Sequence, residues 1–98
     1  AVIPDLCLPV PMGVYSGLYI EMKYDTGRLE DSQKKMLKAL AAAGHYCTVC
    51  YGAEEAIRVL QEYINLKKID TGNREDAMSE QNLMIRKNGK VKCIIFKE

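Results

Sequence analysis

Three charged side chains near the start of the chain have the types and spacing of a site for a divalent cation. Asp5 follows Pro4, and Glu21 and Lys23 come sixteen residues later, two positions apart. If residues 17–23 form a strand, Glu21 and Lys23 project from the same face, because side chains alternate across a strand. Two carboxylates that converge without a nearby arginine repel each other. Mg²⁺, which prefers hard oxygen ligands, would remove that repulsion.

Two short strands must bring these groups together. Residues 6–10 are predicted to form the first strand, and the prolines and glycine of residues 9–16 form the connection. Residues 17–23 are predicted to form the second strand, and residues 25–27 turn the chain. In the second strand one face carries Leu18, Ile20 and Met22, and the other carries Tyr19, Glu21 and Lys23.

A helix is expected from residues 30–32 to Ala43, with Asp31 or Ser32 as its cap and Gly44 as its stop. Gln33 lies on the inward side, one turn before the apolar stripe. Three lysines lie toward the outward side. The expected stripe is Met36, Leu37, Leu40, Ala41 and Ala43 or Gly44, and the outward lysines are Lys34, Lys35 and Lys38.

The rest of the chain alternates between the two kinds of element. A strand at 46–51 precedes a helix at 53–66, a polar linker at 67–82 and a hairpin at 83–98 that turns at Asn88-Gly89. This order predicts a single α/β (α+β) domain over residues 1–98, with its core in residues 1–66 and a mixed central sheet flanked by helices. The buried stripe of the second helix is expected at Ala53, Ala56, Ile57, Leu60 and Ile64.

Composition narrows the classes of function. The 98 residues carry a net charge of only +1, so any contact with nucleic acid must come from a local basic patch. No apolar run approaches the ~18 residues that a membrane helix needs, so no membrane partner is expected. The four cysteines suit reduced thiols in a cytoplasmic or nuclear setting.

The motif and its surroundings together resemble a known family. The pattern Pro4-Asp5 followed by Glu21-x-Lys23 is that of PD-(D/E)xK nucleases, and it is weak when it stands alone. The wider match resembles the VRR-NUC (virus-type replication-repair nuclease) family over residues 2 to about 64. It comprises Ile3-Pro4-Asp5-Leu6, the run from Gly17 to Lys23, Gly27-Arg28-Leu29, Gln33, Leu40 and Gly44.

The resemblance implies a role for each motif residue. Asp5 and Glu21, with the backbone carbonyl of Met22, would bind Mg²⁺ or Mn²⁺. Lys23 would orient or help to deprotonate the attacking water, and Gln33 would hold that water or brace the metal ligands. A bound metal lowers the pKa of its water, and a nearby lysine adds fixed positive charge.

The same resemblance implies a fold like those of restriction endonucleases and Holliday-junction resolvases. It also implies a homodimer that cleaves branched or flapped DNA in replication, repair or recombination, with a phage, virus or mobile element as the source. Family members usually carry a further acid on a helix ahead of the Pro-Asp strand, and in this sequence, which begins at Ala1, that acid is expected either to have been cut away or to be contributed otherwise. The alternative is therefore a catalytically weak module for structured-DNA binding or dimerisation.

Several residues have competing interpretations. Lys34, Lys35 and Lys38 are either DNA contacts or a solvated helix face. The basic hairpin residues are either a DNA arm or a charged edge that blocks strand aggregation, and the edge interpretation is favoured. Cys47 and Cys50 form a CxxC by spacing, but residues three apart on a strand face opposite sides, which argues against zinc or redox chemistry. The hairpin residues in question are Arg86, Lys87, Lys90 and Lys92.

Overall fold

The computed structural model describes residues 3–66 and 82–95. Five strands form one sheet in the order β1-β2-β3-β4-β5. β1 pairs antiparallel with β2, β2 and β3 pair parallel, β3 and β4 pair parallel, and β4 and β5 pair antiparallel. The strands are β1 (Leu6–Leu8), β2 (Leu18–Lys23), β3 (Tyr46–Tyr51), β4 (Asn82–Lys87) and β5 (Lys90–Ile95).

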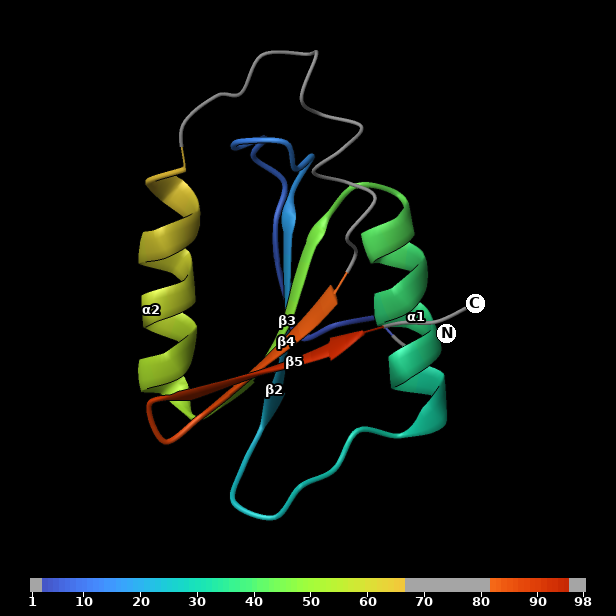
Figure 1. Ribbon diagram of the computed structural model, residues 1–98, viewed down its shortest axis with the longest axis vertical. Coiled ribbons are helices and arrows are strands. Elements are labelled where there is room, and N and C mark those ends of the chain that lie inside the picture. The colour runs from blue at the N-terminus through green and yellow to red at the C-terminus, as the bar shows by residue number, and fades with distance from the viewer. Residues whose placement is uncertain (1–2, 67–81, 96–98) are drawn as a thin grey trace.

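Two helices cover opposite faces of this sheet. Helix α1 (Asp31–Ala42) connects β2 to β3, and helix α2 (Ala53–Ile64) follows β3. Figure 1 shows the sheet between the two helices, with α1 against one face and α2 against the other. Such crossovers place parallel strands in the middle of a sheet, where both faces are covered. The predicted mixed sheet flanked by helices is therefore confirmed.

The predicted hairpin at the end of the chain is also present. Asn88 and Gly89 separate β4 from β5, and both have positive φ angles of 52° and 75°. A tight turn of this kind requires φ above zero at both central residues, which explains the Asn-Gly pair. Most of the predicted linker lies outside the described residues, and β4 already begins at Asn82.

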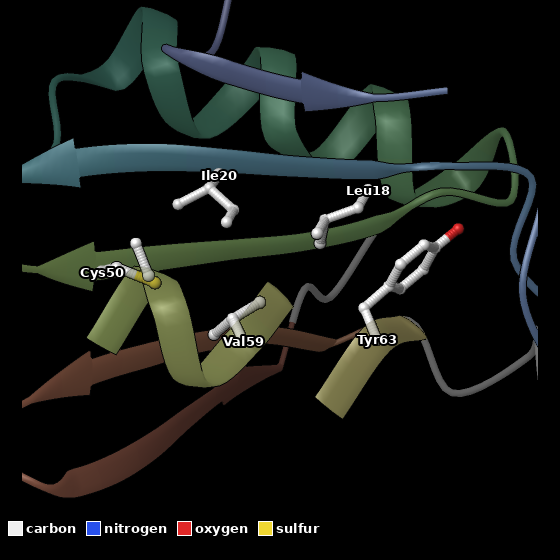
Figure 2. Packing of buried hydrophobic residues seen from close by; sticks show 6 residues of the cluster. Leu18, Ile20, Cys50, Val59 and Tyr63 are labelled. Atoms are coloured by element: carbon white, nitrogen blue, oxygen red, sulfur yellow. The ribbon is translucent and has the colours of Figure 1, made fainter. Parts of the chain in front are cut away.

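The larger apolar cluster lies between the sheet and α2. Leu18, Ile20, Cys50, Val59 and Tyr63 meet there, and Figure 2 shows the two β2 side chains directed toward the helix. The stripe predicted for α2 is confirmed at Ala56 and Leu60, which pack in this cluster, and wrong at Ala53, Ile57 and Ile64, which are exposed. The buried residues of the helix are Glu55, Ala56, Val59 and Tyr63.

A second cluster lies on the α1 face, where Leu37 and Ala41 pack against Cys47 and Val49. The stripe predicted for α1 is confirmed at its two buried positions. The predicted N-cap, Asp31 or Ser32, is wrong, because the N-cap is Glu30. Its side chain accepts from the backbone of Gln33, and Gln33 reaches back in a reciprocal capping box.

The two cysteines of the CxxC lie on opposite faces of β3. Cys50 belongs to the cluster under α2, and Cys47 belongs to the cluster under α1. Burial raises the pKa of the Cys47 thiol to about 12 and that of Cys50 to about 11. Since both thiols remain protonated and face away from each other, they can neither share a metal nor form a disulfide without backbone movement.

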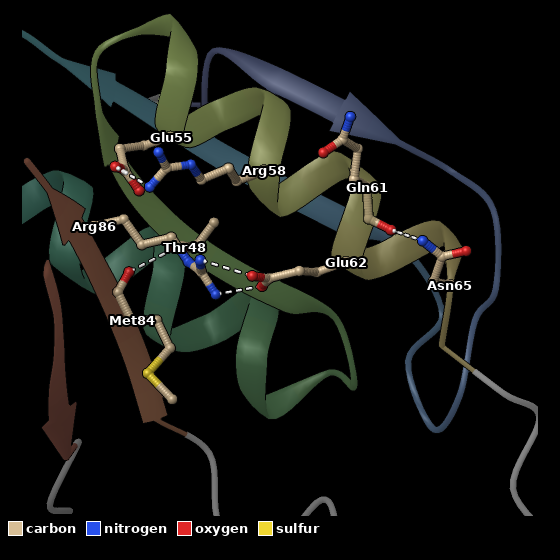
Figure 3. A network of polar contacts seen from close by, with 8 residues as sticks. All are labelled: Thr48, Glu55, Arg58, Gln61, Glu62, Asn65, Met84 and Arg86. Atoms are coloured by element: carbon tan, nitrogen blue, oxygen red, sulfur yellow. Dashed lines mark hydrogen bonds and ion pairs between the residues drawn. The ribbon is translucent and has the colours of Figure 1, made fainter. Parts of the chain in front are cut away.

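The interpretation of Arg86 as an edge charge is wrong. Arg86 lies on β4, which is flanked by β3 and β5, and its guanidinium binds both carboxylate oxygens of Glu62 on α2. Figure 3 shows this pair beside the Thr48 hydroxyl, which donates to the Met84 carbonyl at 2.7 Å. The side chain of Arg86 is only 11% exposed, so it links the sheet to α2.

Candidate active site

Asp5 and Glu21 come together because β1 runs antiparallel to β2. The last pair in the ladder is Leu6 with Ile20, so the next residues along, Asp5 and Glu21, oppose each other. The ladder is extended by a side chain, since Asp5 Oδ2 accepts a hydrogen bond from the Met22 backbone N–H at 2.8 Å. That bond fixes the Asp5 carboxylate beside Glu21.

Glu21 is a buried carboxylate whose charge is stabilised by few hydrogen bonds. Its residue is only 4% exposed, and the contact that Gln33 Nε2 makes with Glu21 Oε2 is long, at 3.5 Å. Burial first, and then the hydrogen bond and the charge of the neighbouring Asp5, raise the pKa of Glu21 to about 7, although the charge of Lys23 acts to lower it. Desolvation and a like charge are the two causes expected to keep a carboxyl protonated near neutral pH.

Gln33 takes part in two structures at once. Its side-chain Oε1 accepts from the Glu30 backbone N–H at 3.0 Å, which satisfies a donor at the start of α1. That bond directs the amide nitrogen toward Glu21. The inward position of Gln33 agrees with the sequence prediction, and the capping box explains why its side chain is held there.

Lys23 ends β2 on the same face as Glu21, and it is half-buried. The chain after it turns through Asp25, whose φ is 47°, and Gly27 then lies against the lysine stem. Two residues from neighbouring strands hold this turn. The Tyr51 hydroxyl donates to the Gly27 carbonyl, and Lys87 Nζ donates to the Asp25 carbonyl at 2.7 Å.

Neither Tyr51 nor Lys87 was predicted to lie at this site. One sequence signal could have pointed to Tyr51, because it is the last residue of the strand that follows the helix after Lys23. The structure shows that the two strands are parallel and that Tyr51 and Lys23 are Cα partners. Lys87 had no such signal, because its place beside Tyr51 depends on the parallel pairing of β3 with β4.

The three lysines proposed to contact DNA differ from one another. Lys34 and Lys35 are exposed near the start of α1, whereas Lys38 is only partly exposed and already interacts within the protein. His45 is half-buried, and its ring meets that of Tyr19 edge-on at 5.1 Å. Among the described residues its buried Nδ1 has no hydrogen-bond partner.

The residues at this site fit a hard divalent cation. In the described part of the chain no group of three or more His, Cys, Asp or Glu side chains gathers. Asp5 and Glu21 supply two carboxylates, and the carbonyl of Met22 belongs to the residue whose N–H binds Asp5. The pKa of Glu21 is raised, so the surroundings disfavour its negative charge, and a bound cation would stabilise that charge.

Two comparisons with known proteins identify relatives of this chain. A family model described as "VRR-NUC domain" matches residues 1–54. A solved structure described as "VRR_NUC domain protein" is 37% identical in sequence and superposes with a TM-score of 0.67. The alignment covers 71% of this chain and 59% of that one, so this chain spans little more than half of the similar structure. No curated protein matches. Among the described residues, no helix is long and apolar enough to cross a membrane.

Proposed function

This chain belongs to the VRR-NUC domain family, a family of nuclease domains, and we propose that it is a metal-dependent endonuclease that hydrolyses phosphodiester bonds in DNA. Mg²⁺ or Mn²⁺ is the proposed ion, branched or flapped DNA the proposed substrate, and a homodimer the proposed assembly. The observation that carries the proposal is the convergence of Asp5 and Glu21, of which Glu21 is buried and has a pKa of about 7.

Each residue of the site has its own proposed role. Asp5 and Glu21 hold the ion, with the carbonyl of Met22 as a third oxygen. When bound, the ion supplies Lewis-acid stabilisation of the phosphate and an activated water. Lys23 places a positive charge next to the reacting phosphate, where charge builds up in the transition state. Gln33 keeps Glu21 in place through its amide nitrogen.

Contacts with the DNA backbone are proposed for Lys34 and Lys35. Both are exposed, and they follow Gln33 directly in α1, so they lie at the end of the helix that reaches the site. Lysines in such a position neutralise phosphates and release counterions without reading the sequence. Lys38 is a weaker candidate because it is partly covered and interacts within the protein.

The test is cleavage of a junction and of a flap with Mg²⁺ or Mn²⁺, in parallel with calorimetric metal titration. We expect cleavage by the wild type and none by Asp5→Ala, Glu21→Ala or Lys23→Ala. Metal binding should be lost in Asp5→Ala and Glu21→Ala only. Glu54→Ala and Lys90→Ala are matched controls, because both parent residues are exposed and lie outside the proposed set of catalytic and DNA-contacting residues.

Two results would contradict the proposal. Cleavage that persists in all three alanine variants would remove the site assignment. Metal-independent binding to junctions, without a metal site and without cleavage, would favour the alternative of a DNA-binding or dimerisation module.

A further inference from the structure

We propose that Tyr51 is a positioning residue for Lys23, and that it acts through a hydrogen bond to Gly27. The inference rests on the proposed nuclease function only for the role of Lys23. Lys23 ends β2 and Tyr51 ends the neighbouring strand β3, whereas Gly27 lies in the turn that connects β2 to α1. Tyr51 lies beside the proposed catalytic lysine, and its hydroxyl donates to the Gly27 carbonyl.

The sheet register brings Tyr51 beside Lys23. The two residues are Cα partners at the ends of β2 and β3, so neighbouring strands place them roughly 5 Å apart. The Tyr51 ring belongs to the cluster on the α1 face, which is also the face of Glu21. Its hydroxyl donates to the Gly27 carbonyl, which lies four residues after Lys23.

Gly27 in turn lies against the Lys23 side chain. A Cβ placed on Gly27 would lie 3.6 Å from Lys23 Cδ and 3.1 Å from the Tyr24 carbonyl oxygen. The Gly27 N–H donates to that same carbonyl at 2.8 Å, so the turn folds back over the end of β2. A lysine has four flexible methylene groups, and a wall on one side of its stem limits the positions that its ammonium can reach.

A second contact holds the Tyr51 ring itself. Lys87 Nζ lies 4.6 Å from the centre of the ring, and it also donates to the Asp25 carbonyl at 2.7 Å. The turn is therefore tied to β3 at Gly27 and to β4 at Asp25. Because the ring stays in place through Lys87 and the α1 cluster, removal of the hydroxyl alone should loosen only the Gly27 side of the turn.

The principal variant is Tyr51→Phe, which keeps the ring and loses one hydroxyl. We expect the single-turnover cleavage rate at saturating metal and DNA to fall about tenfold, with unchanged affinity for metal and DNA, since misplacement of a reacting group acts on the chemical step. The matched control is Tyr63→Phe. Tyr63 also donates its hydroxyl to a backbone carbonyl, that of Val10, but on the opposite face of the sheet, so its removal should leave the rate unchanged.

A second readout observes Lys23 directly and without cleavage. After reductive ¹³C-methylation, the Lys23 resonance can be identified by its absence in Lys23→Arg. In metal-free protein we expect this resonance to move toward the position of a mobile lysine in Tyr51→Phe and to stay unchanged in Tyr63→Phe. Gly27→Ala changes the contact between Gly27 and the Lys23 side chain without altering Tyr51. It tests the positioning role of the turn if Tyr51→Phe does not fold.

The outcomes are distinct from those of the nuclease test. If the wild type cleaves DNA and both Tyr51→Phe and Gly27→Ala keep the wild-type rate and Lys23 resonance, the positioning role is overturned. If the wild type does not cleave but the Lys23 resonance responds as expected, the positioning role stands and the nuclease function fails.

Discussion

Two glutamates of this protein are almost equally buried, yet the fold treats them in opposite ways. Glu21 is 4% exposed on the α1 face, and Glu55 is 5% exposed at the start of α2. Glu55 accepts from the Gly89 N–H at 2.9 Å and from Arg58 at 3.3 Å, so it ties the hairpin turn to the helix. Figure 3 shows the Arg58 contact.

Glu21 receives no comparable support. Its contact with Gln33 is 3.5 Å long, and its other hydrogen-bonding neighbour is an acid, Asp5, which raises its pKa. A buried carboxylate with such weak partners is costly, and carboxyl groups with strongly shifted pKa values cluster at functional sites. The comparison teaches that Glu55 is satisfied within the protein, whereas Glu21 is suited to a cation from outside.

The largest expected effect is on catalysis at Glu21. Glu21→Gln keeps the size of the side chain and removes its charge, so the cleavage rate should fall by roughly a hundredfold to a thousandfold, because metal-based stabilisation amounts to several kcal/mol. Circular dichroism should show an intact fold. Wild-type rates in this variant, measured in single-turnover assays, would place the essential acid elsewhere.

Glu55→Gln should have the opposite profile. The loss of charge weakens the bonds from Gly89 and Arg58, and we expect a fall of about 1–3 kcal/mol in the free energy of unfolding. The cleavage rate at a temperature where the variant remains folded should be unchanged. Urea denaturation measures the first quantity. A catalytic defect in the fully folded variant would contradict the contrast between the two acids.

The pH dependence of stability should distinguish the acids further. The pKa of Glu21 in the folded protein is about 7, above the ~4.3 of an unfolded glutamate, so the folded state binds the proton more tightly. Metal-free wild type should therefore lose stability as pH rises from 5 to 8, by about 2 kcal/mol more than Glu21→Gln. Urea denaturation at both pH values gives this difference, and equal pH profiles would contradict it.

The smallest expected effect concerns DNA affinity. Lys34→Gln combined with Lys35→Gln should weaken binding severalfold and reduce the slope of log affinity against log salt by roughly 1 to 2, since each lysine neutralises one phosphate. The measurement is fluorescence anisotropy in Ca²⁺, at several salt concentrations. Lys90→Gln, an exposed lysine at the hairpin, is a control for general loss of charge.

The sequence was sufficient for local features and insufficient for those that depend on strand order. Alternation placed Glu21 and Lys23 on one face, and Asn88-Gly89 identified the hairpin, because both signals act over a few residues. The edge assignment of Arg86 failed because nothing local shows that β4 inserts beside β3.

The error in α2 has a different origin. Ile57 and Ile64 fit a helical stripe by hydropathy, but the face that meets the sheet carries Glu55, Val59 and Tyr63 at a spacing of four. A stripe that begins with a charged residue scores poorly on apolarity alone. The hydrogen-bond partners of Glu55 are Arg58 and the backbone N–H of Gly89, which lies more than thirty residues later in the chain. Only Arg58 is close enough in sequence to be recognised as a partner.

The bond from the Met22 N–H to Asp5 has a practical consequence. In most of a sheet, amide protons are protected from exchange by hydrogen bonds to backbone carbonyl groups. The Met22 amide proton is protected instead by the Asp5 carboxylate, which we propose also binds the metal ion. Its exchange with deuterium therefore reports the occupancy and orientation of Asp5 in solution. One backbone signal can follow the loading of the site while no reaction takes place.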